Sequence, residues 1–210
     1  MSVEFIQKWI ESAVCGLLGK DAVDESDLAK IKYLAVGESF QNDFFIEMSL
    51  EQPPKPFVNF DGGDEWTYCL RGADIKPLIE KFKGKTDVEL SMFGLDKEDE
   101  EWEEIIFTEE SESLWKKFSK CVFKDRHYEK HTDLDEWDAW YDGVSASLWR
   151  DISLFTGVEV LRIQGLDIPD LTFLDNFPDL RALELVETKF AKTDGIEKLE
   201  RLEQLACWLD

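Results

Sequence analysis

The last third of the chain repeats one apolar pattern every 22 residues. The three copies of this pattern are Val158, Leu161 and Ile163; Leu180, Leu183 and Leu185; and Leu202, Leu205 and Cys207. The register also holds between the copies, where Ile168, Leu171, Leu174 and Phe177 align with Phe190, Thr193, Ile196 and Leu199. A fixed period indicates one short structural unit used several times, and such units stack because none can bury its apolar face alone.

The spacing Leu-x-x-Leu-x-Leu, at a period of roughly 20 to 29 residues, is typical of leucine-rich repeats. We therefore predict an α/β fold, a leucine-rich-repeat-like solenoid. Period-two alternation along each strand turns the side chains between the apolar positions outward, onto a concave sheet face. The partner-binding residues predicted in this way are Val160, Arg162, Gln164, Glu184, Val186, Gln204 and Trp208. Trp208 is the best anchor for a partner, since Trp is enriched at binding hot spots, or it covers the open end of the last repeat.

The N-terminal segment repeats the strand motif after an amphipathic helix, which we expect over residues 1–20. The strand motif itself is formed by Ile31, Leu34 and Val36. The stretch FIQKWIESAVCGLLGKDAVDESDLAKIKYLAV resembles the helical N-terminal cap and first strand of bacterial, internalin-like leucine-rich-repeat proteins. The resemblance covers about residues 4–37 and 150–210, and it implies a cap that shields the first strand. The sequence departs from the family at the ninth repeat position, where Leu166, Thr188 and Asp210 replace the usual Asn.

Residues 38–153 show no clear 22-residue register. We predict a helical cap and first strand over 1–37, an irregular central α+β region or insertion over 38–153, and repeats over 154–210. Alternating segments on either side of a proline-rich turn predict a small antiparallel sheet in the central region. Further along, residues 137–148 have the apolar spacing of an amphipathic helix with acidic residues on its other face.

The chain has 47 acidic and 24 basic residues, a net charge of −23. This charge disfavours phosphate backbones and anionic membranes, so we predict neither a nucleic-acid nor a membrane partner. No apolar stretch approaches the ~20 residues of a membrane span, and the N-terminus lacks a signal-peptide pattern. We therefore expect a cytoplasmic protein.

Charge also suggests the kind of partner. The acidic run 96–112 could imitate a nucleic-acid backbone in the basic groove of another protein, or it is a solvated loop. A basic strip within 116–131 follows, which could instead pack near 96–112 or near 133–142 of the same chain. We predict a non-catalytic protein-binding module of leucine-rich-repeat type, in its sharper form an acidic inhibitor or immunity-type protein for a basic partner.

The alternative function is a hydrolase or metal-dependent enzyme that uses acidic and His residues of the central region. His127 and His131 are four residues apart, which on a helix would let them share a divalent metal ion. Asp133, Asp135 and Asp138 have the alternate spacing of calcium ligands, but the Gly and Glu of a calcium loop are missing. We find no nucleophile, phosphate-loop or Cys-x-x-Cys motif, and we predict no catalytic residues, no metal ligands and no cofactor.

The repeats end at Asp210, one strand into the third copy. An uncovered strand edge is normally paired, covered or charged. We therefore expect the central region or another chain to cover it. Homodimerisation through this C-terminal edge is one hypothesis.

Overall fold

The computed structural model describes residues 3–39, 43–55, 57, 67–70, 75–88, 109–130 and 133–208. The helices are α1 (Lys8–Leu18), α2 (Glu25–Leu28), α3 (Ile75–Phe82), α4 (Glu109–Phe118) and α5 (Leu134–Ile152), with short 3₁₀ turns η3 (Ser119–Cys121), η4 (Leu171–Asn176) and η5 (Ile196–Arg201). The strands are β1 (Tyr33–Glu38), β2 (Phe44–Ser49), β3 (Thr67–Leu70), β4 (Thr86–Val88), β5 (Phe123–His127), β6 (Val160–Gln164), β7 (Asp167–Ile168), β8 (Ala182–Val186), β9 (Lys189–Lys192) and β10 (Gln204–Trp208).

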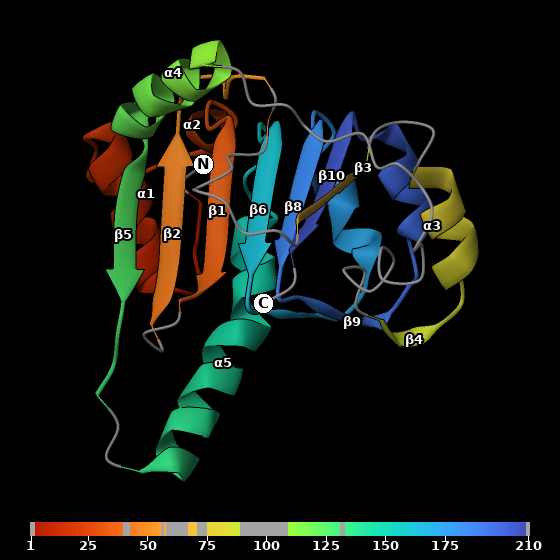
Figure 1. The fold of residues 1–210 in the computed structure, drawn as a ribbon. Helices are drawn as coiled ribbons and strands as arrows, with labels where there is room; N and C mark the ends of the chain where they lie inside the picture. Colours follow the sequence, from red (N-terminus) through yellow and green to blue (C-terminus); the bar gives the residue numbers. More distant parts are fainter. Residues whose placement is uncertain are drawn as a thin grey trace.

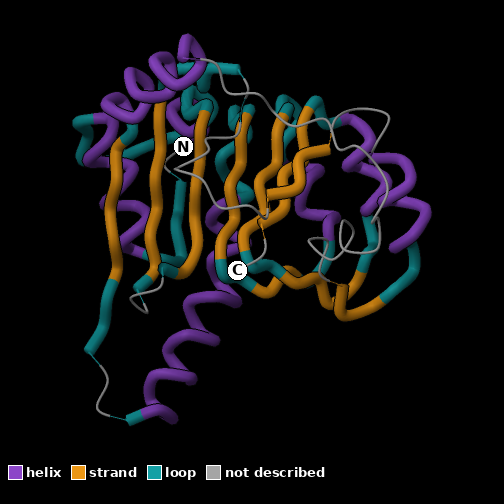
Figure 2. The backbone as a smooth tube through the Cα atoms, in the orientation of Figure 1, coloured by secondary structure: helices purple, strands orange, loops and turns teal. Residues whose placement is uncertain are grey.

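The described strands form two sheets (Figure 1). The large sheet has seven strands in the order β3-β10-β8-β6-β1-β2-β5, and a small sheet has the order β4-β9-β7. Strands β1, β6, β8 and β10 are parallel, whereas β2, β5 and β3 add to them in antiparallel pairings. Figure 2 shows these strands as one continuous layer with helices beside it.

The 22-residue register is confirmed by the strand pairing. Val160 pairs with Ala182, and Ala182 pairs with Gln204, so each step between neighbouring repeat strands is one sequence period. Tyr33 pairs with Val160, which places the strand of the N-terminal motif beside the first repeat strand. The apolar spacing therefore predicted the four parallel strands and their order in the sheet.

The predicted leucine-rich-repeat-like solenoid is nevertheless wrong, because the structure is a mixed α/β fold on a seven-stranded and a three-stranded sheet. The central region contributes β2 and β5 on one side of the parallel strands and β3 on the other. The two alternating segments predicted there as strands form β2 and β3, but they pair with the parallel strands on opposite sides of the sheet and not with each other. The repeat pattern reports only the parallel strands, so it could not reveal these antiparallel additions. The division into 1–37, 38–153 and 154–210 stays a prediction.

The C-terminal strand edge that motivated the homodimer hypothesis is occupied. Strand β3 pairs antiparallel with β10, with Thr67 opposite Trp208 and Leu70 opposite Leu205. The central region thus covers this edge, which is one of the two outcomes that the sequence predicts. Homodimerisation through the C-terminal edge stays a prediction, although the open edge that motivated it is paired with β3.

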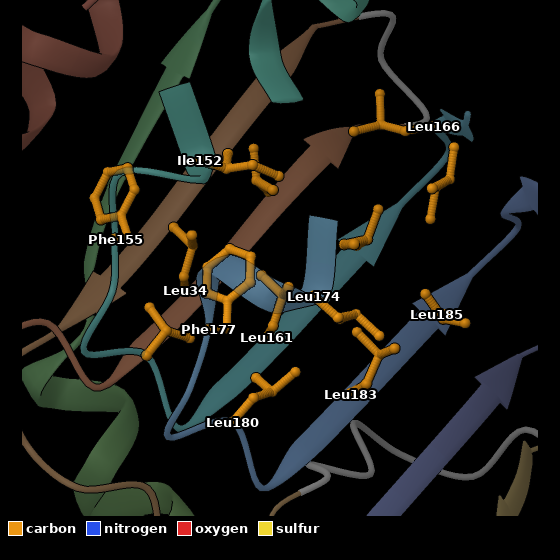
Figure 3. Close-up of a cluster of buried hydrophobic side chains, with 14 of the residues drawn as sticks. Leu34, Ile152, Phe155, Leu161, Leu166, Leu174, Phe177, Leu180, Leu183 and Leu185 are labelled. Carbon is orange, nitrogen blue, oxygen red and sulfur yellow. The ribbon is translucent and has the colours of Figure 1, made fainter. Parts of the chain in front are cut away.

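One face of the large sheet carries the main core (Figure 3). Val158, Leu161 and Ile163 are completely buried there, as the alternation predicts. The core continues into α1, α3, α5, η4 and η5 through residues such as Val14, Leu148 and Leu174. These elements form the layer behind the sheet.

The start of α1 depends on a residue far away in sequence. The N-cap Gln7 makes no side-chain capping bond of its own. The buried carboxylate of Asp151, near the end of α5, instead accepts hydrogen bonds from the backbone N–H groups of Ile6 at 2.9 Å and Gln7 at 2.7 Å. A carboxylate at this position satisfies orphan N–H groups and opposes the positive end of the helix dipole. Asp151 therefore joins α1 to α5.

Candidate functional site

The predicted partner-binding residues lie on the second face of the large sheet, opposite the main core. The sequence predicts that they face solvent, but five of them are buried: Val160, Gln164, Glu184, Val186 and Gln204. Arg162 is partly buried, and Trp208 pairs with Val186 through its strand while its side chain lies outside the described residues. The predicted exposure of this face is therefore wrong, and a partner-binding role for its residues stays a prediction.

This second face is buried because other elements pack on it. Trp115 and Phe118 of α4, together with Phe57, form an apolar cluster with sheet residues. The sheet residues in this cluster are Tyr33, Ala35, Val160 and Ala182. The ring of Phe118 meets Tyr33 edge-on at 5.4 Å between centroids. Strand alternation alone could not predict this cover, because the covering residues come from distant parts of the chain.

A polar group lies within the same face. Arg162 is 3.6 Å from Glu184 across the β6–β8 pair, and it donates a hydrogen bond of 3.0 Å to Gln164. The side chain of Gln204 accepts a hydrogen bond of 2.9 Å from the backbone N–H of Phe57. Burial is the main cause that raises the pKa of Tyr33, and the nearby carboxylate of Glu184 acts in the same direction. These polar side chains are held by each other and by the covering segment.

A row of alternating charges crosses the sheet one position before the repeat strands. Arg181 pairs with Glu159 at 3.5 Å and with Glu203 at 2.7 Å, so three residues spaced by 22 positions form one ladder. Lys32 and Lys55 extend it at the two ends, at 3.3 Å from Glu159 and 2.7 Å from Glu203. Hydrogen bonds from Arg181 and Lys55 lower the pKa of Glu203 to about 2. The ladder holds the ends of the repeat strands together, and its charged groups pair with one another within the chain.

An exposed acidic surface with aromatic neighbours lies on α5. Asp133 caps the helix by accepting a hydrogen bond of 2.8 Å from the N–H of Glu136. Asp135, Asp138 and Asp142 follow at helical spacing and are exposed. Figure 1 shows this first half of α5 extending past the lower ends of β1 and β6. We call Asp135, Asp138 and Asp142 the α5 acidic face.

Aromatic side chains hold this half of α5 in place from its inner side. Trp137 stacks on Tyr141 at 5.1 Å, and Tyr141 stacks on Phe44 of β2 at 5.4 Å. The Tyr141 hydroxyl donates a hydrogen bond of 3.0 Å to the carbonyl of Gly165. Burial raises the pKa of Tyr141, and neighbouring carboxylates such as Glu38 act in the same direction. The α5 acidic face therefore has a fixed position relative to the sheet.

Within the described residues, no ion pair neutralises Asp135, Asp138 or Asp142. The sequence predicted an amphipathic helix with an acidic side at this place, and α5 confirms the helix. The sequence suggested Asp135 and Asp138 only as calcium ligands and did not predict a protein-binding site there. Their spacing of three and four positions was the available signal.

The residues considered for metal binding have other roles or lie outside the described part. His127 is in strand β5, not in a helix, and its ring stacks on Trp9 at 5.3 Å between centroids. His131 lies outside the described residues, as do positions 96–108 of the acidic run, while 109–112 belong to the first turn of α4. The described residues contain no group of three His, Cys, Asp or Glu side chains that could hold a metal ion.

The comparisons with known proteins add no relative. No family model, no curated protein and no solved structure matches this chain. The resemblance to internalin-like proteins therefore stays a prediction. No helix among the described residues combines the length and the apolar character that crossing a membrane requires.

Proposed function

We propose that the chain is a non-catalytic protein-binding module that takes a basic protein partner on the α5 acidic face. The observation that supports this most is the exposure of Asp135, Asp138 and Asp142 on a helix that extends past the sheet, with no ion-pair partner for them in the described part of the chain. The cytoplasmic location and the inhibitor or immunity-type role expected from the sequence belong to the same proposal. The proposal does not involve the leucine-rich-repeat architecture.

Electrostatics supports a basic partner. A net charge of −23 attracts cationic proteins over several ångströms and repels anionic ones. Complementary charges mainly raise the association rate and suppress wrong partners, and their effect declines with salt. An acidic inhibitor of a basic protein uses both properties, because it must find its target quickly and leave other proteins alone.

The experiment compares two variants with the same change in net charge. The test variant is Asp135→Lys/Asp138→Lys/Asp142→Lys. The control variant is Asp21→Lys/Glu25→Lys/Asp179→Lys, which changes exposed residues just before α2, in α2 and just before β8. Each protein is used to capture partners from the lysate of its host at low and moderate salt.

We expect a basic protein to be captured by the wild type and the control, to be lost at higher salt, and to be lost by the test variant. A captured protein that both variants lose equally would mean that net charge alone acts. A captured protein that both variants retain would place the binding surface elsewhere. Either of these two results contradicts the proposal.

A further inference from the structure

The large sheet ends in strand β5, and the two ends of this strand lie beside surfaces of opposite charge. β5 pairs with β2 and is the last strand in the order of the described sheet. The chain enters β5 from α4 and η3, and it leaves β5 towards α5. Figure 1 shows α4 above one end of β5 and the start of α5 beyond the other end. The side of the molecule along β5 therefore runs from α4 to the α5 acidic face.

The end of this side at α4 is basic. Lys116 and Lys117 lie in the last turn of α4, Lys120 lies in η3, and all three residues are exposed. The described part of the chain contains no ion-pair partner for any of them. The acidic residues of α4 are in its first turn, at the other end of the helix. We call Lys116, Lys117 and Lys120 the α4 basic end.

The end of the same side at α5 is acidic. Glu129 and Asp133 are exposed between β5 and the α5 acidic face. Residues 129–142 contain six acidic residues, one lysine and one histidine. The negative charge at this end therefore extends from the last residues after β5 to the first half of α5.

The middle of this side uses its charges within the chain. Lys124 of β5 pairs with Glu47 at 2.6 Å, and Arg126 pairs with Asp43 at 3.2 Å. The side chain of Asp125 accepts a hydrogen bond of 2.9 Å from the backbone N–H of Arg126. Charged residues on an edge strand disfavour direct backbone pairing with another chain. The charges that can attract another molecule therefore lie at the two ends and not in β5.

The two ends are too far apart to neutralise each other within one chain. The five residues of β5 span about 17 Å, which is roughly twice the Debye length of about 8 Å at physiological ionic strength. A two-fold axis that crosses β5 at right angles exchanges the two ends. Two-fold dimers are the commonest symmetric assemblies, and their interfaces are self-complementary in this sense.

We infer that a second copy of the chain docks along this side in the antiparallel direction, with the α4 basic end of each copy on the α5 acidic face of the other. One two-fold axis makes both contacts at once. This interface lies at the opposite end of the large sheet from the C-terminal strand edge. The net charge of −23 opposes the dimer at long range, but salt screens distant charges more than charges in contact. We therefore expect the tightest dimer at physiological ionic strength and a weaker one at very low or high salt.

The inference does not rest on the proposed function, because self-association needs no other protein. Both occupants use the α5 acidic face, so a second copy and a basic partner exclude each other. The dimer thus keeps this face covered until a basic partner displaces the second copy.

Charge swapping tests the dimer by sedimentation equilibrium at high micromolar concentration and physiological ionic strength. The first variant is Lys116→Glu/Lys117→Glu/Lys120→Glu, and the second is Asp135→Lys/Asp138→Lys/Asp142→Lys. The control for the first variant is Lys83→Glu/Lys85→Glu/Lys192→Glu, which changes the net charge equally at exposed residues around the small sheet. The control for the second is the reversal of Asp21, Glu25 and Asp179 described above.

We expect the wild type and both controls to sediment as dimers, and each variant alone to dimerise at least about 100-fold more weakly. An equimolar mixture of the two variants should restore the dimer, because both contacts of the mixed pair again join opposite charges. A monomeric wild type would overturn the inference. Variants that stay dimeric alone, a mixture that stays monomeric, or controls that dissociate like the variants would overturn it as well.

The same variants separate this inference from the proposed function. The first variant keeps the α5 acidic face, so it should still capture a basic partner from the lysate although it no longer dimerises. A dimer test that fails while this capture succeeds overturns only the second-copy inference. A dimer that behaves as expected while no basic protein is captured contradicts only the proposed function.

Discussion

The bond between α5 and the start of α1 gives a prediction whose size follows from the structure. The Asp151 side chain is completely buried. It accepts hydrogen bonds from the backbone N–H groups of Ile6 and Gln7, which lie 145 and 144 residues earlier in the sequence. Replacing Asp151 by Ala leaves both N–H groups without this acceptor and removes a carboxylate from the helix N-terminus. We expect Asp151→Ala to lower the free energy of unfolding more than any exposed acidic substitution does.

The magnitude combines two contributions. A hydrogen bond to a charged group contributes about 1.5 to 3 kcal/mol, and an N-cap lost to Ala costs about 0.5 to 2 kcal/mol. These contributions overlap because they describe the same bonds, so we expect a loss of about 3 kcal/mol. For a chain of this size, that loss corresponds to a fall in Tm of about 6 to 12 °C.

The assay is urea unfolding, monitored by Trp fluorescence and circular dichroism. The wild type and the variants should have the same m value. Asp151→Asn keeps one acceptor oxygen and should lose about half as much. Asp138→Ala, on the exposed side of α5, should lose less than about 0.5 kcal/mol. An Asp151→Ala protein within about 1 kcal/mol of the wild type would refute the view that this carboxylate joins the two helices.

Two further predictions concern the charge ladder and a close backbone approach. Because the pKa of Glu203 is lowered to about 2, its ionised form stabilises the fold fully above its ordinary pKa of 4.5, and this contribution is lost as the pH falls towards 2. Glu203→Gln should therefore flatten the acid side of a plot of the urea midpoint against pH, and an unchanged slope would contradict the pairing. A Cβ at Gly157 would lie 1.9 Å from the carbonyl oxygen of Ala29, so Gly157→Ala should destabilise by about 2 kcal/mol or more in the same unfolding assay. A Cβ at Gly143 of α5 meets nothing within 4 Å, so Gly143→Ala should stabilise by up to about 1 kcal/mol and serves as the control.

Local pattern predicted the part of the fold that is repeated. Leu161 and Leu183 lie in adjacent strands and pair across one period, because a 22-residue repeat returns the chain to the same strand position. A local signal also marks the start of α2, where Asp24 forms a capping box with Asp27. These features depend on neighbouring residues or on a fixed period, which the sequence shows directly.

The features that the sequence did not specify depend on contacts between distant residues. The pairing of β3 with β10 and the hydrogen bond from Phe57 to Gln204 join the central region to the last repeat strand. Strand alternation places Glu184 on the second face, but it does not say that this face is covered. The predicted solenoid and the predicted open face were wrong for the same reason, since the repeat pattern carries no information on where the strands and helix of the central region pack.

The measurement that tests the proposed function most directly is the dissociation constant of the captured basic partner, determined by isothermal titration at low salt. Compared with the wild type, we predict that reversing Asp135, Asp138 and Asp142 weakens binding by about 100-fold or more, as expected for about 1 kcal/mol or more per close charge pair. The control reversal of Asp21, Glu25 and Asp179 should change it by less than about 5-fold. Equal weakening in both variants, or none in either, would contradict binding at the α5 acidic face.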